Sequence, residues 1–159
     1  TVKSYNPGNA TTIQLKQNGE EKYSTTIGAD SGNGQVPQNF SFSAVAPGTY
    51  DLVVTKDAHL TYTVTGVEVG DFPLDLTTMT DKVYSTITLL CGDINGDGNI
   101  NVTDLNKVWD AANFNKKVSA ATNKLTDING DGSVNVTDLN VIWDAANFNK
   151  GITACTYNF

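Results

Sequence analysis

The chain has 159 residues, with 17 acidic and 10 basic side chains and a net charge of −7. This balance argues against a nucleic-acid-binding protein, and no apolar run approaches the length of a membrane span. The length suits one domain or two small ones. Because the sequence has neither an initiator Met nor a signal peptide, we expect it to be a C-terminal piece of a longer chain.

Residues 1–90 alternate apolar and polar side chains in short runs that Gly, Pro, Asn and Asp interrupt. No stretch has the periodicity of a helix, and Pro47-Gly48 suits a type II turn between two strands. The runs predict seven strands, at residues 12–17, 22–27, 39–44, 49–55, 60–64, 66–69 and 82–89. We therefore expect residues 1–90 to form an all-β sandwich of about seven strands.

No catalytic site is evident in the chain, and we do not expect an enzyme. His59 is the only histidine and lies in a polar turn, where we expect a solvated side chain. One His and two distant Cys cannot form a zinc cluster. Acid pairs such as Asp71 and Asp75 could imitate glycosidase carboxylates, but no aromatic sugar platform lies near them.

Residues 91–159 contain a 24-residue segment twice, 34 positions apart and identical at 20 of 24 positions. Each copy opens with a 12-residue loop that has oxygen-bearing side chains at the positions that ligate Ca²⁺ and Gly at position 6. The predicted ligands are Asp93, Asn95, Asp97, the Asn99 carbonyl, Asn101 and Asp104 in loop 1, and Asp127, Asn129, Asp131, the Ser133 carbonyl, Asn135 and Asp138 in loop 2. We therefore expect two Ca²⁺ ions.

The copies differ from an ordinary EF-hand in two respects. Position 12 is Asp where sensor loops have Glu, and residues 82–90 before loop 1 predict a strand instead of an entering helix. A helix is expected after each loop, because Leu105, Val108, Trp109 and Ala112 have helical spacing, as have Leu139, Ile142, Trp143 and Ala146. Each copy is thus predicted to be a loop followed by one helix.

This pattern resembles the dockerin family, including the Gly92–Gly98 opening, Asp at position 12 and the missing entering helix. The resemblance covers residues 91–159 and implies a small all-α dockerin domain that binds a cohesin domain of a scaffoldin or anchoring protein. It also implies a non-catalytic assembly role in an extracellular, cellulosome-like complex. The preceding residues 40–69 resemble X-modules and carboxypeptidase-regulatory-like β-sandwiches, so the expected domains are 1–90 and 91–159.

In dockerins similar to this one, the partner contacts loop positions 10 and 11 and exposed helix positions. Here these are Val102, Thr103, Trp109, Asp110 and Phe114, and in the second copy Val136, Thr137, Trp143, Asp144 and Phe148. Because these sets are identical, either copy could face the cohesin, in two orientations about 180° apart. Both tryptophans also fit the core stripe of their helices, so packing inside the domain remains an alternative for them.

The two cysteines flank the repeat. A pseudo-twofold duplicate tends to bring its ends together, and dockerins resemble each other in clasping their termini, so we expect a Cys91–Cys155 disulfide. The alternative is two reduced structural thiols. Oxidising surroundings and millimolar calcium both predict a secreted, extracellular protein, and the resemblance to dockerins implies a bacterial one. We expect a monomer when it is free of its partner.

Two other functions remain as alternatives. A calcium sensor would expose a Met-rich groove, but the single methionine, Met79, lies outside the repeat. The chain could instead be a carbohydrate-binding or enzyme-accessory fragment of a polysaccharide-degrading protein. In each case we expect the β-domain to contact the repeat, because no Gly/Ser/Pro-rich spacer separates them.

Overall fold

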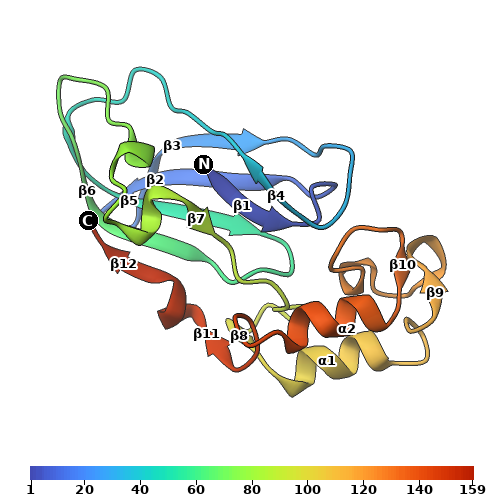
Figure 1. The fold of residues 1–159 in the computed structure, drawn as a ribbon. Coiled ribbons are helices and arrows are strands. Elements are labelled where there is room, and N and C mark those ends of the chain that lie inside the picture. The colour runs from blue at the N-terminus through green and yellow to red at the C-terminus, as the bar shows by residue number, and fades with distance from the viewer.

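The computed structural model describes all residues 1–159 and places a β-sandwich beside a smaller unit with two short helices (Figure 1). We call residues 1–90 the β-domain and residues 91–155 the repeat unit. None of the helices has the length and apolar content that a membrane span requires.

The larger sheet of the sandwich has the strand order β12-β6-β5-β2-β3. Its strands are β2 (Thr11–Gln17), β3 (Glu20–Ile27), β5 (Gly48–Lys56), β6 (Tyr62–Val69) and β12 (Thr156–Asn158). Alternate residues of β2, β5 and β6 are buried, among them Ile13, Leu52, Val54 and Val64. This period of two places one apolar face of the sheet against the core.

Strand β6 joins two of the predicted strands, residues 60–64 and 66–69, into one. The pairing of β5 with β6 shifts between Tyr50 and Leu52, and the Gly66 N–H donates to the Asp51 carboxylate at 3.1 Å. The interruption in the sequence pattern is therefore a β-bulge, which bends a strand without ending it.

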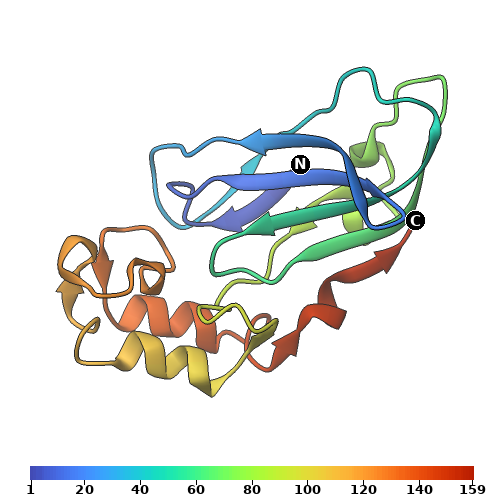
Figure 2. The ribbon, with the colours of Figure 1, turned by 180° about the vertical axis from the view of Figure 1, so that it is seen from behind.

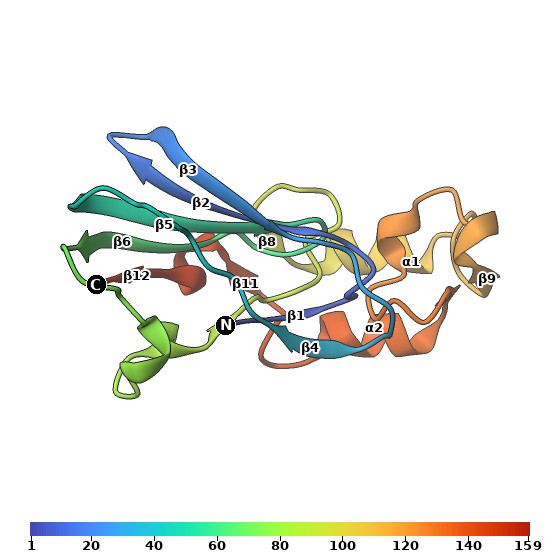
Figure 3. The same cartoon turned by 90° about the horizontal axis from the view of Figure 1, so that it is seen from above.

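The smaller sheet has the order β4-β1-β7 and covers part of the first sheet, as the view from above shows (Figure 3). Its strands are β1 (Val2–Tyr5), β4 (Gln35–Gln38) and β7 (Ile87–Thr88). The single-turn 3-10 helices η1 (Leu76–Thr78) and η2 (Val83–Ser85) precede β7.

Two predicted strands of the β-domain are wrong in this region. Residues 39–44 form no strand, because Phe40 and Phe42 turn toward an apolar cleft at the end of the sandwich instead of continuing β4. Residues 82–89 are mostly η2 and extended chain, because β7 pairs with β1 over two residues only.

The repeat unit contains helix α1 (Val102–Trp109) and helix α2 (Val136–Trp143), each preceded by a loop of the predicted calcium-binding type. Both helices end earlier than the apolar spacing suggested, because Asp110 and Asp144 leave the helical conformation at ψ 134° and 137°. The remaining elements are β8 (Asn99–Ile100), β9 (Lys116–Lys117), η3 (Val118–Ala120), η4 (Lys124–Thr126), β10 (Ser133–Val134), β11 (Lys150–Gly151) and η5 (Ile152–Cys155).

The β-domain contacts the repeat unit directly, as predicted. At the junction the Gly92 N–H donates to the Ala58 carbonyl at 2.7 Å, and His59 forms a β-bridge with Cys91. The prediction of a solvated His59 is wrong: the residue is 7% exposed, and its backbone pairs with Cys91 at the start of the repeat unit. Its Nδ1 donates to the Asp57 carbonyl at 2.7 Å.

The C-terminal strand returns from the repeat unit to the β-domain. Strand β12 pairs in parallel with β6, and Figures 1 and 2 show this segment running along the sandwich to its far end. The rings of Tyr157 and Tyr62 pack at a centroid distance of 5.0 Å, and Phe159 stacks on Tyr84. The repeat unit is thus attached to the sandwich at both of its ends.

Candidate functional site

A capping box joins the last ligand positions of each loop to the following helix. In loop 1 (residues 93–104) the Thr103 N–H donates to Asn101 Oδ1 at 2.8 Å, and the Asn101 N–H donates to Asp104 Oδ2 at 2.9 Å. Loop 2 (residues 127–138) has the same two bonds at the same distances, through Asn135, Thr137 and Asp138. Positions 9 and 12 are therefore fixed relative to each other by the start of the helix.

The aspartate at position 12 also ties the helix to the start of its loop. Asp104 Oδ1 accepts the N–H groups of Ile94 and Asn95 at 2.9 and 3.3 Å. Asp138 Oδ1 accepts those of Ile128 and Asn129 at 2.8 and 3.2 Å. Both carboxylates are fully buried. The helix thus lies close enough to its loop for the short aspartate to reach the loop interior.

The side chains at positions 1, 3 and 5 accept bonds from backbone N–H groups of the same loop. Asp93 Oδ2 accepts from Gly98 at 3.0 Å, and Asp127 Oδ2 accepts from Gly132 at 3.0 Å. Both glycines have positive φ, 80° and 85°, where the chain turns inward. The following Asn99 and Ser133 donate from their backbone to Asp97 and Asp131 at 2.9 Å.

Burial raises the pKa of Asp93 and Asp127, and it raises the pKa of Asp138 to about 6. A neighbouring acid adds to each shift: Asp104 to that of Asp93, Asp131 to that of Asp127 and Asp127 to that of Asp138. A bound cation would oppose these shifts, because it favours the ionised carboxylates.

The donor set fits calcium better than a metal that needs a cluster of charged ligands. No group of three or more His, Cys, Asp and Glu side chains is placed to hold a metal ion by itself, so a site here must use amide and carbonyl oxygens as well. Carboxylate oxygens that accept N–H bonds keep a free lone pair for an ion. Hard oxygens of mixed type are the ligands that Ca²⁺ prefers.

Each loop is also paired with the chain that follows the helix of the other copy. Strand β8 of loop 1 pairs with β11, and strand β10 of loop 2 pairs with β9. Position 8, Ile100 or Val134, is fully buried. The two loops therefore support one another across the pseudo-twofold axis.

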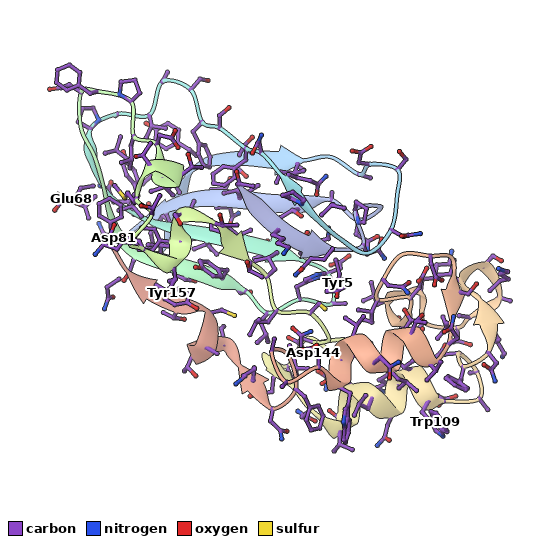
Figure 4. The ribbon with its side chains drawn as sticks, viewed as in Figure 1. Tyr5, Glu68, Asp81, Trp109, Asp144 and Tyr157 are labelled. Carbon is purple, nitrogen blue, oxygen red and sulfur yellow. The ribbon has the colours of Figure 1, made fainter.

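The two helices form a shallow apolar groove on their outer side. It is lined equally from both copies by Val102, Leu105, Asn106, Trp109, Val136, Leu139, Asn140 and Trp143. Both tryptophans are 62% exposed and both valines more than half exposed, and Figure 4 shows Trp109 directed away from the β-domain (Figure 4). Of the two alternatives for the tryptophans, packing in the core does not apply.

The other predicted contact residues have structural roles. Phe114 and Phe148 pack on Trp109 and Trp143, each at a centroid distance of 4.6 Å. The carboxylates of Asp110 and Asp144 accept the N–H groups of Ala112 and Ala146 and close the turn after each helix. These aspartates do not line the groove, and Asp144 lies near Tyr5 of the β-domain.

The threonines predicted to contact the partner also belong to the loops. Thr103 Oγ1 accepts from Asn95 Nδ2 at 3.2 Å, and Thr137 Oγ1 accepts from Asn129 Nδ2 at 2.9 Å. Each threonine thus helps to orient the asparagine side chain at position 3 of its loop.

Cys91 and Cys155 are both buried, and both are free thiols, so the expected disulfide is not formed. The two side chains have separate partners: the Asn147 amide donates to Cys91 Sγ at 3.7 Å, whereas Cys155 lies near the Leu90 backbone and the Tyr62 ring. Burial raises the pKa of both thiols. The ends of the repeat unit are held by β12 and by hydrogen bonds.

Sequence reasoning missed two pairs of asparagines. Asn106 and Asn140 line the groove, and the helical spacing from Val102 and Val136 could have identified them. Asn113 and Asn147 are buried and bond to distant backbone groups. The Asn113 side-chain oxygen accepts the N–H of Asn123, and the Asn147 side-chain oxygen accepts that of Cys91. No local pattern indicates this role.

Comparisons with known proteins agree with this architecture. Residues 91–144 match the dockerin type I domain family. No curated protein sequence matches the chain. Two crystal structures of type II cohesin–X-dockerin complexes from Acetivibrio cellulolyticus, an N-terminal and a C-terminal interface mutant, have TM-scores of 0.61 and 0.64. They are 22% and 23% identical, and each match covers 96% of this chain and 97% of the other, so the likeness extends to the β-domain.

Proposed function

We propose that this chain, in which residues 91–144 are a dockerin type I domain, is a calcium-dependent module that binds a cohesin domain. The β-domain, residues 1–90, is an X-module that supports it. The module anchors a parent protein into an extracellular, cellulosome-like bacterial complex and has no catalytic role of its own. The two similar structures are cohesin–X-dockerin complexes formed by their own proteins.

The observation that carries the proposal is the apolar groove between α1 and α2. Four exposed large apolar side chains, Val102, Trp109, Val136 and Trp143, gather there from the two copies. Exposed apolar patches of this kind mark protein interaction sites, and large aromatics are good anchors. The groove has the same residues from each copy, so a cohesin could bind in two orientations about 180° apart.

The position of the two loops supports calcium dependence. Each groove helix begins at a capping box made of two predicted ligand positions. The two ions would draw both ends of each loop together and so fix the spacing of the helices, as metal binding often supplies the folding energy of small modules.

The test is binding to a panel of type I and type II cohesin domains, measured by calorimetry with calcium and with chelator. The variants are Val102→Asp, Val136→Asp and the double variant. Both valines are more than half exposed, so the substitutions spare the core, and replacing the threonines would disturb loop residues Asn95 and Asn129. Ser119→Asp adds the same charge at an exposed site outside the groove.

We expect each single variant to keep near-native affinity for the cohesin that binds, because the partner can turn to the unaltered copy. The double variant should lose about a hundredfold or more, since a charge then lies in the interface in either orientation. A large loss from one valine alone would indicate a single orientation. Retention of affinity by the double variant would refute the groove as the binding surface.

A further inference from the structure

The two calcium loops begin with the same six residues, DINGDG, yet they have different surroundings. In loop 1, Asn95 and Gly96 are exposed to solvent, whereas their counterparts Asn129 and Gly130 in loop 2 are partly buried. Figure 2 shows the β-domain turns after β1 and β3 lying against the loop 2 side of the repeat unit.

Two hydrogen bonds connect the β-domain to the backbone of loop 2. Asn6 Nδ2 donates to the Asp127 carbonyl at 2.9 Å, and the Gly34 N–H donates to the Asn129 carbonyl at 2.6 Å. Asp127 and Asn129 are positions 1 and 3 of the loop. Both bonds go to backbone carbonyls that are not predicted ligands, so they orient the ligand residues without occupying their side chains.

Asn6 is itself held firmly. Its N–H donates to the Gly34 carbonyl at 3.1 Å, and its own carbonyl accepts the Asn9 N–H at 3.1 Å. Its φ of 52° is a conformation that Asn adopts more readily than most residues. The side chain that reaches loop 2 therefore starts from a fixed backbone.

The contact is close enough to restrict the loop sequence. A methyl group added at Gly130 would lie 2.7 Å from Asn6 Oδ1 and 3.2 Å from Asn6 Cα. The same group at Gly96 would have no neighbour within 4 Å, although the two glycines have nearly equal φ, 74° and 73°. Loop 2 thus has a specific neighbour where loop 1 has none.

From this asymmetry we propose that Asn6 is a positioning residue for the second calcium site. The β-domain holds loop 2 in its ligand-binding conformation, so that loop 2 binds Ca²⁺ more tightly than loop 1 and fills first. The physical cause is preorganisation, since less ordering remains to be done on binding. By linkage, calcium in loop 2 also strengthens the contact with the β-domain. This inference rests on the proposed calcium binding of both loops.

The first experiment is a calcium titration of the full chain, followed by the backbone amide resonances of Gly98 and Gly132, which report loops 1 and 2 separately. In the unmodified chain the Gly132 resonance should respond at lower calcium. Asn6→Gly keeps the positive φ and removes the amide; it should weaken loop 2 about fivefold, the worth of one such hydrogen bond, and leave loop 1 unchanged.

The second experiment uses Gly130→Ala and Gly96→Ala as a matched pair. Both substitutions place Ala at the same positive φ, so the backbone strain is equal and only the collision with Asn6 differs. Gly130→Ala should weaken loop 2 by more than Gly96→Ala weakens loop 1, by a further factor of about five or more. This pair does not depend on how well the Asn6 variant folds.

The outcomes separate the two proposals. If neither loop of the unmodified chain binds calcium, the proposed function is overturned, and this inference with it. If both loops bind but fill together, if Asn6→Gly affects both equally, or if the two alanine variants behave alike, the positioning role of Asn6 is overturned while calcium binding stands.

Discussion

The first and second copies of the repeat differ in how they are attached, although 20 of their 24 residues are the same. The chain leading into the first copy contacts the β-domain through Cys91 and Gly92, just before loop 1. The second contacts it through loop 2 and continues into β12 of the large sheet. A duplicated sequence therefore does not make equivalent sites, because the stability of each copy depends on what packs against it.

Chelation of calcium should remove the difference between the copies, because we propose that both depend on a bound ion. Each loop holds three aspartates whose mutual repulsion a cation relieves, and the repeat unit has a small core. We expect excess chelator to abolish the helical circular dichroism of α1 and α2 while the β-domain keeps its strand signal. Helical signal that persists in chelator would contradict this dependence.

Removing the aspartate at position 12 should affect the two loops to different degrees. Asp104→Ala and Asp138→Ala each leave three loop N–H groups without an acceptor, at about 1–3 kcal/mol for each group that stays buried. We expect each variant to lose one ion, as mass spectrometry under native conditions would show. Amide exchange should accelerate more in loop 1 of Asp104→Ala than in loop 2 of Asp138→Ala, because Asn6 and Gly34 still bond to the backbone of loop 2.

Acid should weaken the junction at which the chain enters the first copy. Burial lowers the pKa of His59 from 6.5 to about 4, and its Nε2 has no partner. Since the folded pKa is depressed, stability is fully present above pH 6.5 and is lost as the pH falls toward about 4, by roughly 3 kcal/mol.

The measurement is chemical denaturation at several pH values in saturating calcium. His59→Gln does not titrate in this range and should lose less stability than the unmodified chain between pH 6.5 and 4. Parallel pH profiles for the two proteins would rule out this role of His59.

The C-terminal strand should give the smallest effect and the one most confined to the second copy. Tyr157→Ala removes a half-buried ring that packs on Tyr62 and should cost about 1–2 kcal/mol, less than a fully buried aromatic. Tyr157→Phe is the control, because it loses only the bond from the hydroxyl to the Ala154 carbonyl. Equal amide-exchange changes in both copies would show that β12 does not stabilise the second copy in particular.

The sequence by itself located the loops, a helix in each copy and the absence of an entering helix, although the helices begin at Val102 and Val136, inside the loops and not after them. These features are local: the ligand positions lie within 12 residues, and Asn101 and Asp104 of the capping box are three residues apart. The strands β2, β3 and β5 were also predictable within one or two residues, because β2 and β5 each bury one face and β3 pairs with β2, its neighbour in the chain.

Only the tertiary structure decided the features that depend on distant contacts. Residues 39–44 have the alternation of a strand but line a cleft, and His59 lies in a polar turn but is buried where its backbone pairs with Cys91. The helical stripe contained both Val108 and Trp109, yet Val108 is fully buried and Trp109 is 62% exposed. The inequality of the two loops arises from Asn6, which lies 121 residues before Asp127. Chemistry within one loop is fixed by neighbouring residues, whereas burial and pairing depend on which remote segments fold against it.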